Sequence, residues 1–99
     1  MVKLLSIRPS EDSKYKYTAT FETEGGRTKT THFGAKGMKD YTLYPPGVRE
    51  QHKASYLARH RVTENWNDPT SAGALSRWVL WNLPTVSGSI RDYKRRFNL

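Results

Sequence analysis

The sequence predicts an α+β domain in which a three-stranded antiparallel β-meander at the N-terminus is followed by about three α-helices. Three observations lead to this prediction. The first third of the chain alternates polar and apolar residues, later apolar residues recur at helical spacing, and capping residues and prolines mark helix ends. Because 99 residues suffice for one core only, residues 1–99 are expected to form a single domain.

The strands are expected in the first third. Residues 2–8 read as the first strand and residues 9–13 as a turn-rich connection, and the alternation of Tyr15, Tyr17, Ala19 and Phe21 with polar residues predicts the second strand. Gly25-Gly26 predicts a two-residue hairpin loop. This loop sets a register in which the facing pairs are Glu24 and Arg27, Glu22 and Lys29, Phe21 and Thr30, and Ala19 and His32. Two of these pairs have opposite charges, which supports the register. The exposed face of the sheet would then carry Lys14, Lys16, Thr18, Thr20, Lys29 and Thr31.

Three helices are expected after a glycine- and proline-rich loop over residues 34–47. The first covers residues 48–61, where Val48, His52, Tyr56 and His60 recur every four residues. Asp68-Pro69 predicts the start of the second, a central core helix that runs to about Asn82. Thr85 is a suitable cap for the third helix. The expected core consists of Tyr17, Phe21, Tyr56, Leu75, Trp78, Val79, Ile90 and Phe97.

The composition favours a polyanionic partner. Lys and Arg number 17 against 9 Asp and Glu, which gives a net charge of +8, a pI near 10.0 and a mean hydropathy of −0.82. The chain has no cysteine, so it offers no disulfide, thiolate nucleophile or thiolate zinc site. It also shows no signal peptide and no apolar run near the roughly 20 residues of a membrane span, so we expect an intracellular protein without a membrane partner.

Metal binding and catalysis find little support. His52 and His60 are eight residues apart, which is roughly 12 Å along a helix, and no zinc-type spacing occurs. The acidic residues are scattered rather than clustered as Mg²⁺ sites require. Asp40, His60 and Glu64 would make an acid–base site only if the fold brought them together. We therefore expect neither an enzyme nor a bound cofactor or metal.

The basic residues are the better candidates for a site. Four positive charges occur within six residues near the C-terminus, and others occur on the sheet, the following loop and the first helix. The predicted DNA-binding residues are Lys14, Lys16, Lys29, Lys36, Lys39, Arg49, Lys53, Arg91, Lys94, Arg95 and Arg96. Arg59 and Arg77 lie in aromatic-rich segments, so a structural role is favoured for both. Trp66 and Tyr44 are the aromatic residues expected to be exposed, whereas Trp78 and Trp81 are expected in the core.

An ordered series of motifs resembles a known family. The series is His32-Phe33-Gly34, Asp40-Tyr41, residues 56–60, Glu64-Asn65-Trp66, residues 72–82 and residues 89–97, and it leaves the N-terminal strands out. It is similar to a family of small basic proteins of unknown function that recurs in large and giant DNA viruses of protists, marseillevirus-like viruses among them, and in some algae. The resemblance implies a viral infectious cycle around a large DNA genome, but it implies no catalytic residues.

Together these observations predict a non-enzymatic nucleic-acid-binding protein. The expected partner is duplex DNA, bound with little sequence preference during viral genome handling or packaging. The expected location is the infected host cell, in the nucleus or a cytoplasmic viral factory, or the virion itself. A protein–protein interaction module, either a virion component or a factor directed at a host protein, is the main alternative, and a small metal-dependent nuclease is the second. An open sheet edge also makes a homodimer plausible.

Overall fold

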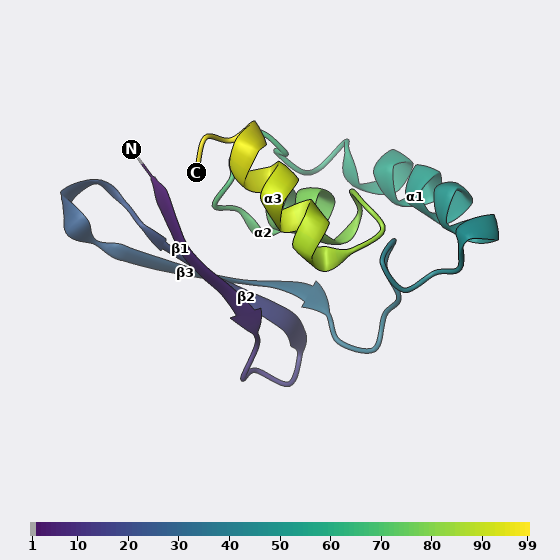
Figure 1. Ribbon diagram of the computed structural model, residues 1–99, viewed down its shortest axis with the longest axis horizontal. Coiled ribbons are helices and arrows are strands. Elements are labelled where there is room, and N and C mark those ends of the chain that lie inside the picture. The colour runs from purple at the N-terminus through teal and green to yellow at the C-terminus, as the bar shows by residue number, and fades with distance from the viewer. Residues whose placement is uncertain (1) are drawn as a thin grey trace.

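The computed structural model describes residues 2–99 and shows a three-stranded antiparallel sheet with helical segments on one face (Figure 1). The strands, in sheet order, are β1 (Lys3–Pro9), β2 (Tyr15–Glu22) and β3 (Thr28–Ala35). The other elements are the 3-10 turn η1 (Glu24–Gly26), α1 (Pro46–His60), α2 (Ala72–Leu75), the π-helical turn η2 (Ser76–Leu80) and α3 (Val86–Arg96). In Figure 1, α2 and α3 lie over the sheet, whereas α1 stands beyond the end of β3. The predicted α+β class is confirmed.

The core lies between the sheet and the helical layer and is rich in aromatic rings. Its buried residues are Ala19, Phe21, Phe33, Tyr41, Tyr56, Leu75, Val79, Leu80, Trp81 and Tyr93. Four of the eight expected core residues are therefore buried, and Tyr17, Trp78, Ile90 and Phe97 pack against them half-buried. Tyr93 is fully buried, and its hydroxyl donates a hydrogen bond to the carbonyl of Pro69 at 2.5 Å. This bond ties α3 to the segment that precedes α2.

The predicted register of β2 against β3 is wrong by one residue. Glu22 lies opposite Thr28 and Phe21 opposite Lys29, so Glu22 and Lys29 do not face each other. The cause is the loop, because η1 has three residues and the Thr23 N–H bonds to the Arg27 carbonyl at 2.7 Å across it. A shift of one residue moves side chains to the opposite face. Lys29 and Thr31 therefore lie on the helix side of the sheet rather than on its open face.

The alternation of faces breaks near the start of β2. Gly34 has a φ of +79°, and a Cβ at this position would lie 2.7 Å from the Leu80 Cδ1 atom. At this point Lys16 turns toward the helical side and Tyr15 turns to the open face, where its ring stacks on His32. Lys16 was also expected on the open face, and the structure corrects that expectation too.

The helix ends follow the expected capping chemistry with one exception. Thr85 caps α3 by accepting a hydrogen bond from the Gly88 N–H, as predicted. Asp68 does not begin the second helix, because its Oδ1 atom accepts from the N–H and hydroxyl of Thr70 in a turn. Ser71 is the true cap of α2. The helical path then widens in η2, where the Trp81 N–H bonds to the Ser76 carbonyl five residues back.

Candidate functional site

Two of the predicted DNA-binding lysines have partners inside the protein. Lys16 Nζ donates to Asp40 Oδ2 at 2.7 Å, and only 15% of its side chain is exposed. Lys29 Nζ donates to the hydroxyl of Thr70 at 2.9 Å, and thereby links β3 to the turn before α2. Because Lys16 is largely buried in an ion pair, it is less available to phosphate than an exposed lysine is, whereas Lys29 is exposed and its hydroxyl partner leaves its charge in place.

Two more of the predicted cations lie against an aromatic ring. Arg49 and Lys53, both on α1, stand over the ring of Tyr41 at 5.5 and 4.8 Å from its centre. Lys53 Nζ also donates to the carbonyl of Asn82 at 3.0 Å. Burial, together with the charge of Arg77, lowers the pKa of Lys53 below its usual value. Lys53 therefore anchors α1 to the segment between η2 and α3.

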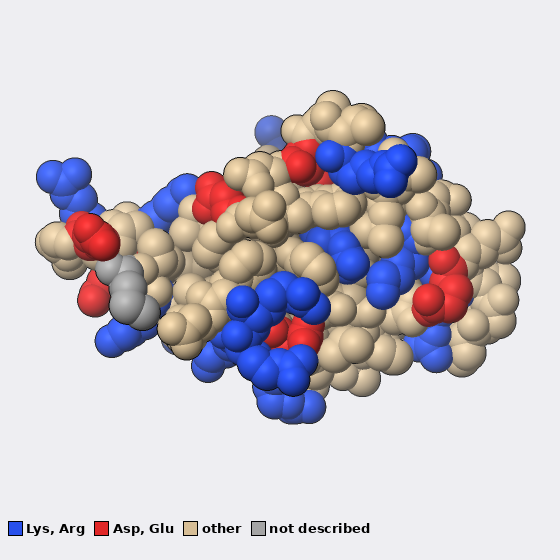
Figure 2. Space-filling view, turned by 90° about the horizontal axis from the view of Figure 1, so that it is seen from above, with Lys and Arg blue, Asp and Glu red and all other residues tan. Residues whose placement is uncertain are grey.

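The C-terminal cations are divided between bound and unbound groups. Arg95 and Arg96 both form ion pairs with Asp92, although the side chain of Arg95 is 82% exposed. Arg91 and Lys94 form no side-chain hydrogen bond or ion pair with any residue from 2 to 99. Figure 2 shows Lys and Arg side chains gathered around a carboxylate on the upper face, over α3. We call Arg91 and Lys94 the α3 cations.

A second group of exposed cations, without ion pairs among the described residues, lies at the end of the sheet. Lys14 and Lys36 are neighbours because the Lys36 N–H bonds to the Lys14 carbonyl at 3.0 Å, and Lys39 follows in the same exposed loop, where its ammonium lies 5.8 Å from the centre of the Tyr44 ring. We call these three residues the strand-end lysines. Lys36 lines a shallow depression together with Val86, the first residue of α3. The depression therefore lies between Lys36 and the N-terminal end of the helix that carries the α3 cations.

Arg77 has the structural role that the sequence favours. It donates to the carbonyl of Trp81 at 2.7 Å and stacks on Trp78, with 4.1 Å between the guanidinium and the ring centre. Burial, followed by the nearby charge of Arg96, lowers the pKa of Arg77. Trp66 is half-buried rather than exposed, and its indole N–H donates to Glu64.

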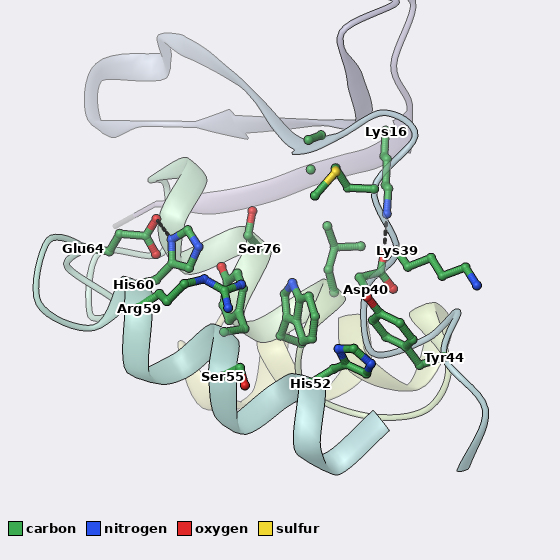
Figure 3. Close-up of a pocket in the computed structure, with 16 residues that line it drawn as sticks. Lys16, Lys39, Asp40, Tyr44, His52, Ser55, Arg59, His60, Glu64 and Ser76 are labelled. Atoms are coloured by element: carbon green, nitrogen blue, oxygen red, sulfur yellow. Dashed lines mark hydrogen bonds and ion pairs between the residues drawn. The ribbon is translucent and has the colours of Figure 1, made fainter. Parts of the chain in front are cut away.

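A cleft of about 350 Å³ separates α1 from the end of the sheet (Figure 3). Asp40, His60 and Glu64, the three residues of the hypothetical acid–base site, all line it, but Asp40 lies across the cleft from the His60–Glu64 pair. Each is already engaged: Asp40 with Lys16, and His60 with Glu64 at 3.1 Å. Within residues 2–99, no three His, Asp or Glu side chains are grouped closely enough to hold a metal ion. The cleft therefore offers paired charges rather than a cluster of free carboxylates.

Sequence reasoning missed most of this cleft. His52, Ser55 and Arg59 reach it from α1, Ser76 comes from η2, and Tyr44 comes from the preceding loop. The signal was the repeat of His52, Tyr56 and His60 every four residues, which indicates a single helix face. The same helix face contacts the core through Tyr56 and lines the cleft with its stacked rings.

Replacing Asp92 by asparagine should make the stability of the protein less dependent on acidic pH. The side-chain amide of Asn82 donates to Asp92 at 2.7 Å, and this bond, with that of Arg95, lowers the pKa of Asp92. A carboxyl whose pKa is lowered in the folded state stabilises the protein above its unfolded pKa of about 3.9, and this stabilisation is lost as the pH falls. We expect Asp92→Asn to cost about 1 kcal/mol at neutral pH and nothing near pH 2, as measured by urea unfolding.

The control for this prediction is Glu11→Gln, which removes an exposed carboxylate without a side-chain hydrogen bond among the described residues. It should leave the pH dependence of unfolding unchanged. If the Asp92→Asn variant lost as much free energy of unfolding on acidification as the unsubstituted protein does, the assigned role of Asp92 would be contradicted.

The comparisons with known proteins place the chain in a family. No curated protein and no solved structure matches it significantly. None of the helices within residues 2–99 has the length and apolar character needed to cross a membrane. Residues 5–60, more than half of the chain, match a family described as "Family of unknown function (DUF5754)". This match includes most of β1 and all of β2, β3 and α1, so it covers most of β1 and all of β2, which the motif series leaves out. The chain belongs to this family of unknown function.

Proposed function

We propose that this protein binds nucleic acid without catalysing a reaction, and that its partner is duplex DNA bound with little sequence preference. One observation carries the proposal. In a chain of net charge +8, the strand-end lysines and the α3 cations are exposed and form no ion pair within the described residues. Five cations without internal counter-charges are suited to neutralise phosphates, and phosphate contacts carry no sequence information.

The geometry changes the set of residues that we assign to this interface. Lys14, Lys36, Lys39, Arg91 and Lys94 form its centre, and the exposed Arg95 lies beside them. Lys16 and Lys53 are held by internal contacts and contribute mainly to the fold, whereas the exposed Lys29 is hydrogen-bonded to Thr70 and keeps its charge at the surface. Arg49 and Arg96 lie over aromatic rings and supply charge at the margin.

The biological setting of this proposal comes from the motif series. Its likeness to a protein family of large DNA viruses favours a role in viral genome handling or packaging. The protein would then act in the nucleus or in a cytoplasmic viral factory of the infected host, or within the virion.

A protein-interaction module is the second candidate, and one observation favours it. The helices leave one face of the sheet uncovered, where Arg8, Thr18, Thr20 and His32 line a shallow hollow. The outer edges of β1 and β3 are also unpaired with any strand among residues 2–99, which suits pairing with a second copy or with another protein.

The test is a titration of labelled 30-mer duplex DNA, single-stranded DNA and duplex RNA, followed by fluorescence anisotropy over a salt series. We expect duplex DNA to bind best, with log Kd rising with log salt at a slope of about four, since each phosphate contact contributes roughly 0.9. Binding that disappears below physiological salt would contradict the proposal. Capture of a saturating protein partner would then favour the interaction module.

A further inference from the structure

The cleft between α1 and the sheet has the size of a small-ligand site and a wall of aromatic rings. Its volume of about 350 Å³ lies at the lower end of the range of ligand pockets. The His52 ring stacks on Tyr44, with 3.8 Å between centres and 4° between planes. Tyr56 stacks on Trp81 and on His60, at 4.5 and 4.3 Å. A planar ring entering the cleft therefore meets other rings with which it can stack.

The charges that remain available in the cleft are positive. Asp40 is only 3% exposed and is occupied by Lys16 and Thr42. The two carboxylate oxygens of Glu64 accept from His60 and Trp66. In contrast, Arg59 is exposed and forms no hydrogen bond or ion pair with residues 2–99, while Lys39 lies at the rim of the cleft with its ammonium 5.8 Å from the centre of the Tyr44 ring.

This distribution of charge discriminates among ligand classes. A cationic ligand would find both carboxylates engaged, and a purely apolar one would leave Arg59 without a role. A planar ring that carries an anionic group can stack on the aromatic wall and pair with Arg59. The hydroxyls of Ser55 and Ser76, which also line the cleft, add neutral hydrogen-bonding groups of the kind that contact a sugar.

We propose that this cleft binds a single nucleotide unit, with the base stacked in the region of His52 and Tyr44 and the phosphate bound by Arg59. The nucleotide is either free in solution or an unpaired residue of a nucleic-acid strand, since both present the same base and phosphate. The site is distinct from the strand-end lysines and the α3 cations, although Lys39 lies at its rim, and does not depend on duplex binding.

The experiment follows the intrinsic tryptophan fluorescence, because Trp81 lines the cleft. Adenosine 5′-monophosphate, adenosine, inorganic phosphate and a short single-stranded oligonucleotide are titrated into the full chain. We expect the monophosphate to bind more tightly than adenosine or phosphate alone. If the oligonucleotide binds and the monophosphate does not, the nucleotide unit comes from a strand. This conclusion requires that oligonucleotide binding is weakened by the variants described next.

The variants separate the cleft from the rest of the basic surface. Arg59→Ala and His52→Ala should each weaken nucleotide binding about tenfold, while Arg59→Lys and His52→Phe retain most of it. Arg61→Ala removes an exposed cation from the end of the same helix, outside the cleft, and should have no effect.

Three outcomes would overturn the proposal: no binding of either nucleotide form, competition by phosphate alone as strong as that by the monophosphate, or unchanged binding in both alanine variants. Duplex binding with its salt dependence would survive each of these outcomes, so the failure of the cleft proposal is distinguishable from the failure of the proposed function.

Discussion

Replacing Lys14, Lys36, Arg91 and Lys94 together by glutamine is expected to weaken duplex DNA binding several hundred-fold, roughly, at about 0.15 M salt. The four side chains are exposed and form no hydrogen bond or ion pair within residues 2–99. Each lost phosphate contact removes about 0.9 from the salt slope, which corresponds to about a fivefold loss at this salt concentration. The anisotropy titration should therefore show a slope lower by about three to four units.

The control for this variant removes cations from the other end of the sheet. Lys3 lies opposite Glu22 and Arg27 follows η1, so both are remote from the strand-end lysines (Figure 1). A Lys3→Gln and Arg27→Gln double variant should change the salt slope by less than one unit. If the salt slope fell by as much per removed charge as in the quadruple variant, net charge rather than this surface would determine binding.

The quadruple variant also separates binding from folding. None of its four side chains has a bonded partner to lose, so its free energy of unfolding in urea should change by less than about 0.5 kcal/mol for each substitution. A large loss of stability would mean that one of these cations has a structural role.

The fold was predictable because its determinants are local. A few neighbouring residues are enough to predict the alternation from Tyr17 to Phe21, the Thr85 cap and the helix that ends at His60. The register failed because opposite charges at Glu22 and Lys29 supported a two-residue loop. The chain instead forms a three-residue turn that includes Gly25 and Gly26, both of which have a positive φ.

The candidate site was less predictable because its partners are distant in sequence. Lys16 pairs with Asp40 across 24 positions, and Lys29 bonds to Thr70 across 41. A lysine that is neutralised inside the fold and a lysine that is open to solvent have the same appearance in a sequence. The cleft likewise depends on a loop, a helix and a π-helical turn that meet only in three dimensions.

Replacing Asp40 by alanine is expected to destabilise the protein by about 3–5 kcal/mol, which would lower the melting temperature by more than about 10 °C. Asp40 is buried and forms a 2.7 Å ion pair with Lys16, whose side chain is itself largely buried. Its other oxygen accepts hydrogen bonds from the N–H and hydroxyl of Thr42. Without the carboxylate, the Lys16 ammonium remains in the cleft wall without its counter-charge.

Asp68 supplies a closely matched control for this prediction. Its Oδ1 atom accepts from the N–H and hydroxyl of Thr70, the same local contacts that Asp40 makes with Thr42, but Asp68 is exposed and is linked to a lysine only through the Thr70 hydroxyl, which accepts from Lys29. Asp68→Ala should therefore cost only about 1 kcal/mol, the value of the turn contacts. The difference between the two variants in urea unfolding isolates the contribution of the buried pair.

A second substitution tests whether the unpaired lysine causes the loss. In the Asp40→Ala background, Lys16→Met removes the ammonium but keeps an apolar side chain of similar length, and we expect it to recover at least half of the lost stability. Equal stability of the single and double variants would instead assign the loss to the Thr42 turn. Recovery would mean that the pair holds the start of β2 against the loop after β3, which is the wall on which the shape of the cleft depends.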